Sequence, residues 1–157
     1  MNPDPFYGNV YFDSCAFDGG NEVEQEASLK ARELFEDNER YVEILHSVAK
    51  EIDFPNTPQW VKSESVDLIY TIEVELTQLE IEQLRQVEIL VVGNGSIDKM
   101  RSDCRHIFEA QKYGRYFVST DKRILKKSGE IKSNFGLYVI KPSEFLETLE
   151  YYVVNRT

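Results

Sequence analysis

The chain is poor in cysteine, tryptophan and proline, and it lacks a long apolar segment. Its 157 residues include two cysteines, one tryptophan and five prolines. Two cysteines provide neither a disulfide framework nor a zinc-binding pattern, and they are typical of a protein in a reducing compartment. No stretch reaches the roughly 18 uninterrupted apolar residues of a membrane-spanning helix, so no membrane partner is expected. Because the first twenty residues contain no lysine or arginine, we expect no secretory signal and predict a cytoplasmic protein.

Basic residues are also scarce, since 18 Lys and Arg face 28 Asp and Glu and the formal net charge is −10. Such an acidic balance argues at first sight against a nucleic-acid partner. However, residues 98–141 hold 11 of the 18 basic residues and only five acids. Exposed charges farther apart than about 10 Å are largely screened, so one basic face can still attract phosphates. Two differently solvated surfaces explain this distribution equally well.

Apolar runs alternate with amphipathic segments along the chain. Runs rich in β-branched and aromatic residues predict strands at 9–15, 88–93, 116–120 and 137–140. Helical spacing predicts helices within 22–51, with a break near 37–38, then at 61–76, 79–87, 97–111 and 122–127, and a last helix from Pro142. Near-continuous apolar strands that alternate with helices favour a parallel sheet covered on both faces. The sequence predicts one α/β domain over 1–157, a three-layer α/β/α sandwich with a mostly parallel central sheet and an acidic helical stretch at about 21–53.

Two acids stand directly after predicted strands. Asp13 closes the first strand, and Asp121 follows the strand at 116–120. In open parallel sheets, ligands bind beyond the carboxyl ends of the strands, at the point where the strand order reverses. If the two strands are neighbours at that point, both carboxylates enter one crevice, where their repulsion favours a bound cation. For either acid alone, capping of the next helix is an ordinary alternative.

Two further acids are candidates on predicted helices. Asp103 borders the apolar stripe of the helix at 97–111, where a hydrogen-bonded structural Asp is the usual alternative. Glu64 lies one turn into the helix expected after Pro58, and taken alone it is one acid among 28.

The order of these segments resembles the PIN-domain nuclease family over nearly the whole chain. YFDSC resembles the family's first strand with Asp13, and PQWVKSE its Pro-x-x-Val-x-x-Glu entry to a helix with Glu64. DCRHIFEAQKYG resembles its Asp-x-x-His/Ile-x-x-x-Ala helix, which begins at Asp103. STDKRIL resembles the segment with Asp121 after the fourth strand, and VIKPSEFLETL the closing Pro-x-x-Phe-Leu.

The resemblance implies a metal-dependent ribonuclease with catalytic Asp13, Glu64, Asp103 and Asp121 around Mg²⁺ or Mn²⁺. In that interpretation the three aspartates bind the metal, and Glu64 orients or deprotonates the attacking water. The residues expected to support Asp121 are Ser119 and Thr120, and those expected to contact the RNA backbone are Arg101, Arg105, Lys122, Arg123, Lys126 and Lys127. Many small members of the family are toxins, so an antitoxin protein and a homodimer are partners that the resemblance implies besides RNA. An RNA-processing role without a cognate partner is equally compatible.

Other functions compete with the ribonuclease interpretation. A receiver-like phosphoacceptor domain has the same sheet layout, and Lys141-Pro142 resembles its Lys-Pro after the last strand. A receiver, however, has its phosphorylated Asp at the end of the third strand, where this chain has Gly93-Asn94. A haloacid-dehalogenase-type phosphatase would need an acid at Cys15. A non-catalytic PIN-like module that binds RNA or protein is the remaining alternative.

Overall fold

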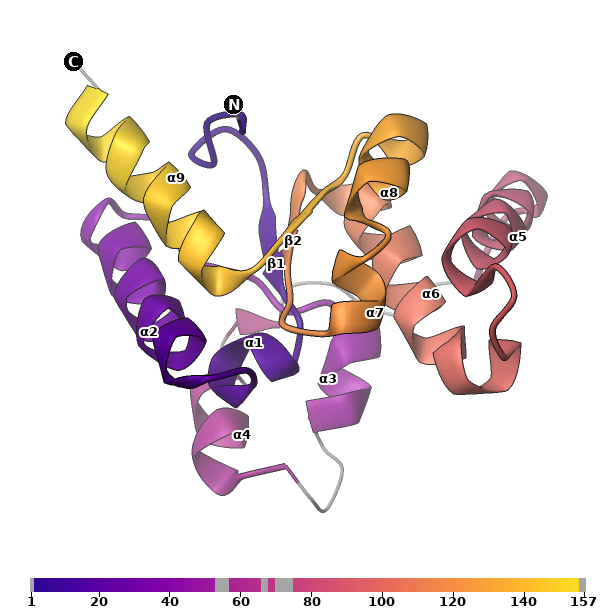
Figure 1. The fold of residues 1–157 in the computed structure, drawn as a ribbon, viewed down its shortest axis with the longest axis horizontal. Helices are drawn as coiled ribbons and strands as arrows, with labels where there is room; N and C mark the ends of the chain where they lie inside the picture. Colours follow the sequence, from indigo (N-terminus) through magenta and orange to yellow (C-terminus); the bar gives the residue numbers. More distant parts are fainter. Residues whose placement is uncertain (1, 53–56, 66–67, 70–74, 156–157) are drawn as a thin grey trace.

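A computed structural model of the protein describes residues 2–52, 57–65, 68–69 and 75–155 (Figure 1). The structure is mixed α/β, and its parallel sheet has the strand order β1-β2-β3. The strands are β1 (Val10–Phe12), β2 (Tyr116–Val118) and β3 (Tyr138–Ile140). Every residue of β1 and β2 is buried, so no alternation of polar and apolar residues marks these strands in the sequence.

Two isolated parallel bridges extend the sheet beyond β1. Tyr11 pairs with Glu43, and Ile44 pairs in turn with Ile69. The segments that pair through Glu43, Ile44 and Ile69 therefore lie on one side of β1, and β2 and β3 lie on the other side. The reversal lies between β1 and β2, and this is the position where parallel sheets bind ligands.

The helices surround this sheet. In the described part of the chain they are α1 (Cys15–Asp18), α2 (Glu22–Asp37), α3 (His46–Ile52), α4 (Gln59–Ser65), α5 (Gln78–Val92), α6 (Ile97–Tyr113), α7 (Lys122–Leu125), α8 (Ser128–Phe135) and α9 (Pro142–Asn155). In Figure 1, α2 and α9 lie on one side of the strands and α6 and α8 on the other, with α5 packed outside α6. None of these helices is long and apolar enough to cross a bilayer.

Aromatic side chains join the sheet to its helices. The Phe145 ring of α9 meets Phe12 of β1 and Phe35 of α2 edge to face, with ring centroids 5.9 and 5.8 Å apart. On the other side, α6 buries Cys104 and Ile107 against the sheet core. This packing confirms the apolar stripe expected for the helix at 97–111, and it fixes the polar face of α6 beside the strand ends.

The strand predicted at 88–93 is wrong, because Glu88–Val92 is the end of α5. A capping box starts this helix: the Thr77 hydroxyl accepts a hydrogen bond from the Glu80 amide, and the Glu80 carboxylate accepts one from the Thr77 amide. Val87 and Val91, four residues apart, are buried, whereas Ile89 between them is 70% exposed. The burial period is therefore that of a helix, which an apolar run of this length does not reveal by itself.

Two other predicted helices also differ from the structure in their bounds. The break expected near 37–38 is confirmed by the end of α2 at Asp37, but residues 43–44 form sheet bridges instead of continuing as helix. The helix predicted at 61–76 ends as α4 at Ser65, and Ile69 lies in a bridge. Residues 66–67 and 70–74 of that prediction lie outside the described residues.

Candidate metal and catalytic site

Asp13 directly follows β1 at the switch point, and its side chain is buried. Its Oδ1 accepts a hydrogen bond from the Ser14 amide at 2.8 Å, and its Oδ2 accepts one from Ser119 Oγ at 2.8 Å and one from Cys15 Sγ at 3.4 Å. Burial raises the pKa of Asp13, while the charge of His106 and the Ser119 hydrogen bond act in the opposite direction. These donors fix the carboxylate at the carboxyl end of β1.

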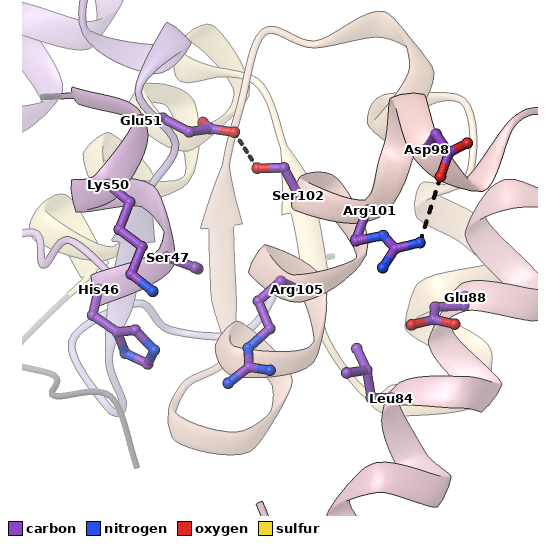
Figure 2. Close-up of a pocket in the computed structure, with 10 residues that line it drawn as sticks. All are labelled: His46, Ser47, Lys50, Glu51, Leu84, Glu88, Asp98, Arg101, Ser102 and Arg105. Atoms are coloured by element: carbon purple, nitrogen blue, oxygen red, sulfur yellow. Dashed lines mark hydrogen bonds and ion pairs between the residues drawn. The ribbon is translucent and has the colours of Figure 1, made fainter. Parts of the chain in front are cut away.

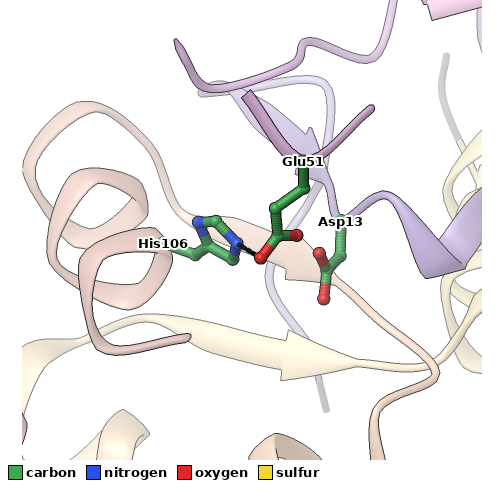
Figure 3. Close-up of side chains that lie close together, drawn as sticks. All are labelled: Asp13, Glu51 and His106. Atoms are coloured by element: carbon green, nitrogen blue, oxygen red, sulfur yellow. Dashed lines mark ion pairs between the residues drawn. The ribbon is translucent and has the colours of Figure 1, made fainter. Parts of the chain in front are cut away.

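Glu51 in the last turn of α3 and His106 on α6 join Asp13 (Figure 3). His106 Nε2 lies 3.0 Å from Glu51 Oε1. Each of the three residues offers one atom that could bind a metal ion, and these three atoms lie within 4.8 Å of one another. We call Asp13, Glu51 and His106 the His106 cluster.

Serine hydroxyls orient this cluster. Ser47 Oγ lies 2.9 Å from His106 Nδ1. The Ser102 hydroxyl donates to Glu51 Oε1, and Ser14 Oγ donates to Glu51 Oε2 at 3.3 Å. Both ring nitrogens of the histidine and both oxygens of the glutamate therefore have polar partners, as buried polar groups require.

The pKa shifts within the His106 cluster favour an imidazolium–carboxylate pair. Burial lowers the pKa of His106, but the Glu51 hydrogen bond and the charge of Asp13 outweigh it and raise the pKa. Burial raises the pKa of Glu51, but the hydrogen bond and charge of His106 outweigh it and lower the pKa. The opposite shifts have one cause, because each charged group stabilises the other.

Asp103 on α6 and Asp121 after β2 form a second group with Arg123 of α7. Arg123 Nη2 lies 3.5 Å from Asp103 Oδ2 and 3.3 Å from Asp121 Oδ2. Asp121 also caps α7, because its Oδ1 accepts a hydrogen bond from the Arg123 amide at 2.9 Å. We call Asp103, Asp121 and Arg123 the Arg123 cluster.

The pKa of Asp103 is raised by burial and by neighbouring acids. Burial and then the charge of Asp121 raise it to about 6, with a further contribution from Asp13 and opposition from Arg123. Within the described residues, Asp103 Oδ2 is buried and accepts no hydrogen bond. The structure therefore brings Asp13, Asp103 and Asp121 together, and the capping role considered for Asp121 coexists with its place beside the other acids.

Ser119 connects the two clusters. Its hydroxyl donates to Asp13 Oδ2 and accepts a hydrogen bond from the Asp121 amide at 3.1 Å. Thr120 instead donates to the Cys15 carbonyl at 3.0 Å and ties the segment after β2 to α1. Of the two supporting residues expected from the sequence, Ser119 is the one that positions Asp121.

The fourth predicted acid, Glu64, lies on α4, and its side chain is outside what the structure describes. Glu51 and His106 were not among the predicted site residues. Glu51 belongs to the acidic stretch at 21–53, and its spacing of four from the buried Ser47 indicates the inner face of α3. His106 belongs to the DCRHIFEAQKYG segment, three residues after Asp103 and therefore on the same face of α6.

The basic residues expected to contact RNA are distributed unevenly. Arg123 contacts the acids, whereas Lys127 Nζ lies 4.0 Å from Glu130 Oε2. Arg105 pairs with the buried Glu109 at 3.3 Å. Arg101, Lys122 and Lys126 are exposed. Arg105, Arg123 and Lys127 are therefore already engaged by acidic side chains of the protein.

The donor set fits a divalent cation. Carboxylate oxygens are preferred by Mg²⁺ and Mn²⁺, and a neutral imidazole adds a nitrogen that suits Mn²⁺ better than Mg²⁺. Asp103 Oδ2, buried and without a hydrogen-bond donor among the described residues, has free coordinating capacity. For His106 to coordinate, it must first lose its proton, so occupancy by metal and the imidazolium–carboxylate pair exclude each other.

No protein-family model matches this chain, and no curated protein matches its sequence. The geometry of the acidic residues is therefore the basis for a functional proposal.

Proposed function

We propose that this protein is a PIN-like, metal-dependent ribonuclease, with its helices and sheet arranged as a three-layer α/β/α sandwich. One observation carries the proposal: the carboxylates of Asp13, Glu51, Asp103 and Asp121 gather at the switch point from four separate elements. A purely structural network rarely collects acids in this way, because their mutual repulsion is costly unless a cation offsets it.

Within this proposal, the aspartates Asp13, Asp103 and Asp121 hold Mg²⁺ or Mn²⁺. Such an ion would supply a water molecule of lowered pKa and positive charge beside the attacked phosphate. Glu51, in hydrogen-bond contact with His106, would take the role first expected of Glu64 and orient the attacking water.

Arg123 is the basic residue best placed to contact the substrate. Its guanidinium lies beside two of the acids and is 55% exposed. A phosphate oxygen at the metal site would be within reach of this side chain, which binds phosphate through a planar set of donors. The PIN-like interpretation also includes an antitoxin protein or a second copy of the chain as partners.

A non-catalytic PIN-like binding module is the second candidate. The observation that favours it is the pairing of acids with protein cations, because His106 bonds Glu51 and Arg123 contacts both Asp103 and Asp121. Such internal compensation would stabilise the site without metal. Receiver chemistry has less support, because the segment 88–92 is helical and provides no third strand end.

Metal binding and cleavage measured on one matched pair of variants test the proposal. Asp13→Asn removes a cluster carboxylate, and Asp37→Asn removes an exposed carboxylate at the end of α2. We expect the wild type and Asp37→Asn to bind Mn²⁺ in calorimetry and to cleave a mixed-sequence RNA, whereas Asp13→Asn loses cleavage by orders of magnitude. Wild-type protein that neither binds Mn²⁺ nor cleaves would favour the non-catalytic module.

A further inference from the structure

The His106 cluster differs from the three aspartates to which the proposed function assigns the metal, because it is more compact and contains a nitrogen donor. Within the part of the chain that the structure describes, Asp13, Glu51 and His106 form the group whose potential ligand atoms all lie within 4.8 Å of one another. Asp103 and Asp121 do not belong to this group. An ion therefore meets an assembled set of donors at the His106 cluster, which shares only Asp13 with the aspartates.

The closest distance in the cluster is that between two neighbouring ligands of one ion. Zn²⁺ is held by imidazole nitrogen and carboxylate oxygen at about 2.1 Å, so two such ligands at right angles lie about 3 Å apart. His106 Nε2 and Glu51 Oε1 are 3.0 Å apart, and Figure 3 shows the Asp13 carboxylate beside them. An ion can therefore take the place of the imidazole proton without a large movement of His106 or Glu51.

Hydroxyl groups hold these side chains in the orientation that metal ligands need. Metal-binding histidines use one ring nitrogen for the ion and form a hydrogen bond through the other. In His106, Nδ1 lies 2.9 Å from Ser47 Oγ, so Nε2 is the nitrogen that faces the carboxylates. Glu51 in turn accepts hydrogen bonds from Ser102 and Ser14, and carboxylate ligands are commonly oriented in this way.

The charge of the cluster also favours a divalent ion. With both carboxylates ionised and the imidazole protonated, the three side chains carry a net charge of −1, and a divalent ion in place of the proton brings that charge to zero. The other histidine of the chain is in a different situation. His46 Nδ1 lies 2.8 Å from Glu109 Oε1, and Arg105 Nε lies 3.3 Å from Glu109 Oε2. One carboxylate there has two basic partners, so His46 serves as a matched control.

The cluster is accessible through Glu51. The side chain of Glu51 is 23% exposed, whereas Asp13 and His106 are buried. Glu51 lines a pocket of about 690 Å³ between α3, α5 and α6 (Figure 2) and a second pocket of about 350 Å³ against α1 and α4. A small ion therefore has a path to the buried donors.

We propose that the His106 cluster is a metal site of its own, which binds a transition-metal ion such as Zn²⁺ in preference to Mg²⁺. Imidazole nitrogen suits Zn²⁺, whereas Mg²⁺ prefers oxygen ligands and retains its water. One consequence rests on the proposed ribonuclease function. An ion held by Asp13 and Glu51 withdraws both carboxylates from the Mg²⁺-dependent reaction, so Zn²⁺ should inhibit cleavage.

NMR spectra of the imidazole groups in the metal-free wild type test the site directly. The chain has two histidines, and the variant His46→Gln assigns their signals. We expect one equivalent of Zn²⁺ to shift the Nε2 resonance of His106 and to leave His46 unchanged, and the same amount of Mg²⁺ to shift neither histidine in this way. Equal shifts of both histidines, no shift with Zn²⁺ or the same shift with Mg²⁺ would overturn the proposal.

Calorimetric titration with Zn²⁺ compares matched variants. His106→Gln should weaken binding at least about tenfold, because the loss of groups that only orient ligands already costs about 10- to 100-fold, whereas His46→Gln should match the wild type. Ser47→Ala, which removes the contact to Nδ1, should weaken binding about tenfold. Its control is Ser28→Ala, because Ser28 is buried and its hydroxyl has no hydrogen-bond partner among the described residues.

Variants that bind Zn²⁺ like their controls would contradict the proposal. If His106→Gln does not fold, the wild-type spectra and Ser47→Ala decide the result. Zn²⁺ that shifts His106 in a protein without Mg²⁺-dependent RNA cleavage would support the metal site and reject the nuclease. Mg²⁺-dependent cleavage that Zn²⁺ does not inhibit, together with an unshifted His106, would support the nuclease and reject the metal site.

Discussion

The His106 cluster and the Arg123 cluster neutralise their acids in different ways. In the first, Asp13 and Glu51 receive hydrogen bonds from serine hydroxyls and face a buried imidazole. In the second, Asp103 Oδ2 accepts no hydrogen bond from any described residue, and its cation is the half-exposed Arg123. One side of the site is a satisfied polar network, whereas the other retains carboxylate repulsion that a metal ion can relieve.

The largest change in the free energy of unfolding is expected in the His106 cluster, where the polar groups have hydrogen-bond partners. His106→Gln should lower the free energy of unfolding in EDTA by about 2 to 4 kcal/mol at pH 6, because it leaves Asp13 and Glu51 without their cation. Ser47→Ala, which removes only a hydrogen bond to the same ring, should cost about 1 kcal/mol. Urea unfolding measures both changes.

The stabilisation by His106 should also depend on pH. Its pKa is raised above 6.5 in the folded protein, so its contribution is complete below that pH and is lost as pH rises through the folded-state pKa. The difference between the wild type and His106→Gln should therefore shrink in alkaline solution. An equal difference at pH 6 and pH 9 would show that the ring contributes through packing alone.

In the Arg123 cluster, we expect a smaller change in the free energy of unfolding, and it is a gain instead of a loss. The pKa of Asp103 rises from 3.8 to about 6 on folding, so this carboxylate destabilises the folded state as pH rises through that interval. Asp103→Asn should therefore raise the free energy of unfolding by about 1 to 2 kcal/mol at pH 7 in EDTA, and by little at pH 4.

The matched control for Asp103→Asn is Asp98→Asn, which removes an exposed carboxylate from the same helix. Its stability should follow that of the wild type closely at both pH values. A loss of stability in Asp103→Asn at pH 7 would instead identify Asp103 as a structural hydrogen-bonding residue and would remove the contrast between the clusters.

The smallest expected effect is a change in Mn²⁺ affinity when the half-exposed Arg123 is replaced. Arg123→Ala should tighten Mn²⁺ binding by about two- to fivefold, because an exposed ion pair contributes at most about 1 kcal/mol and here competes with the metal. Lys122→Ala, its exposed neighbour, should leave the affinity unchanged. Calorimetric titration that shows weaker binding in Arg123→Ala would mean that the arginine organises the acids for metal.

Local signals in the sequence were sufficient for several elements. The strands at 10–12, 116–118 and 138–140 are predictable because they are short apolar runs rich in β-branched and aromatic residues. Helix α6 is predictable because its apolar residues recur at helical spacing. The helical structure of segment 88–92 is not predictable from the run itself, because β-branched residues in a short apolar run suit a strand or a buried helix face. The capping box at Thr77, at the start of the helix that contains that run, decides in favour of the helix.

The sequence by itself determined which acids stand at strand ends, because Asp13 and Asp121 follow apolar runs that must be buried on both faces. It also placed Asp103 at the border of a buried helical stripe. Only the tertiary structure decided that Glu51 and His106 complete the group, since the packing of α3 against α6 brings together residues that are 55 positions apart in the chain. The contact depends on how two helices cross, and neither helix encodes that crossing in its own periodicity.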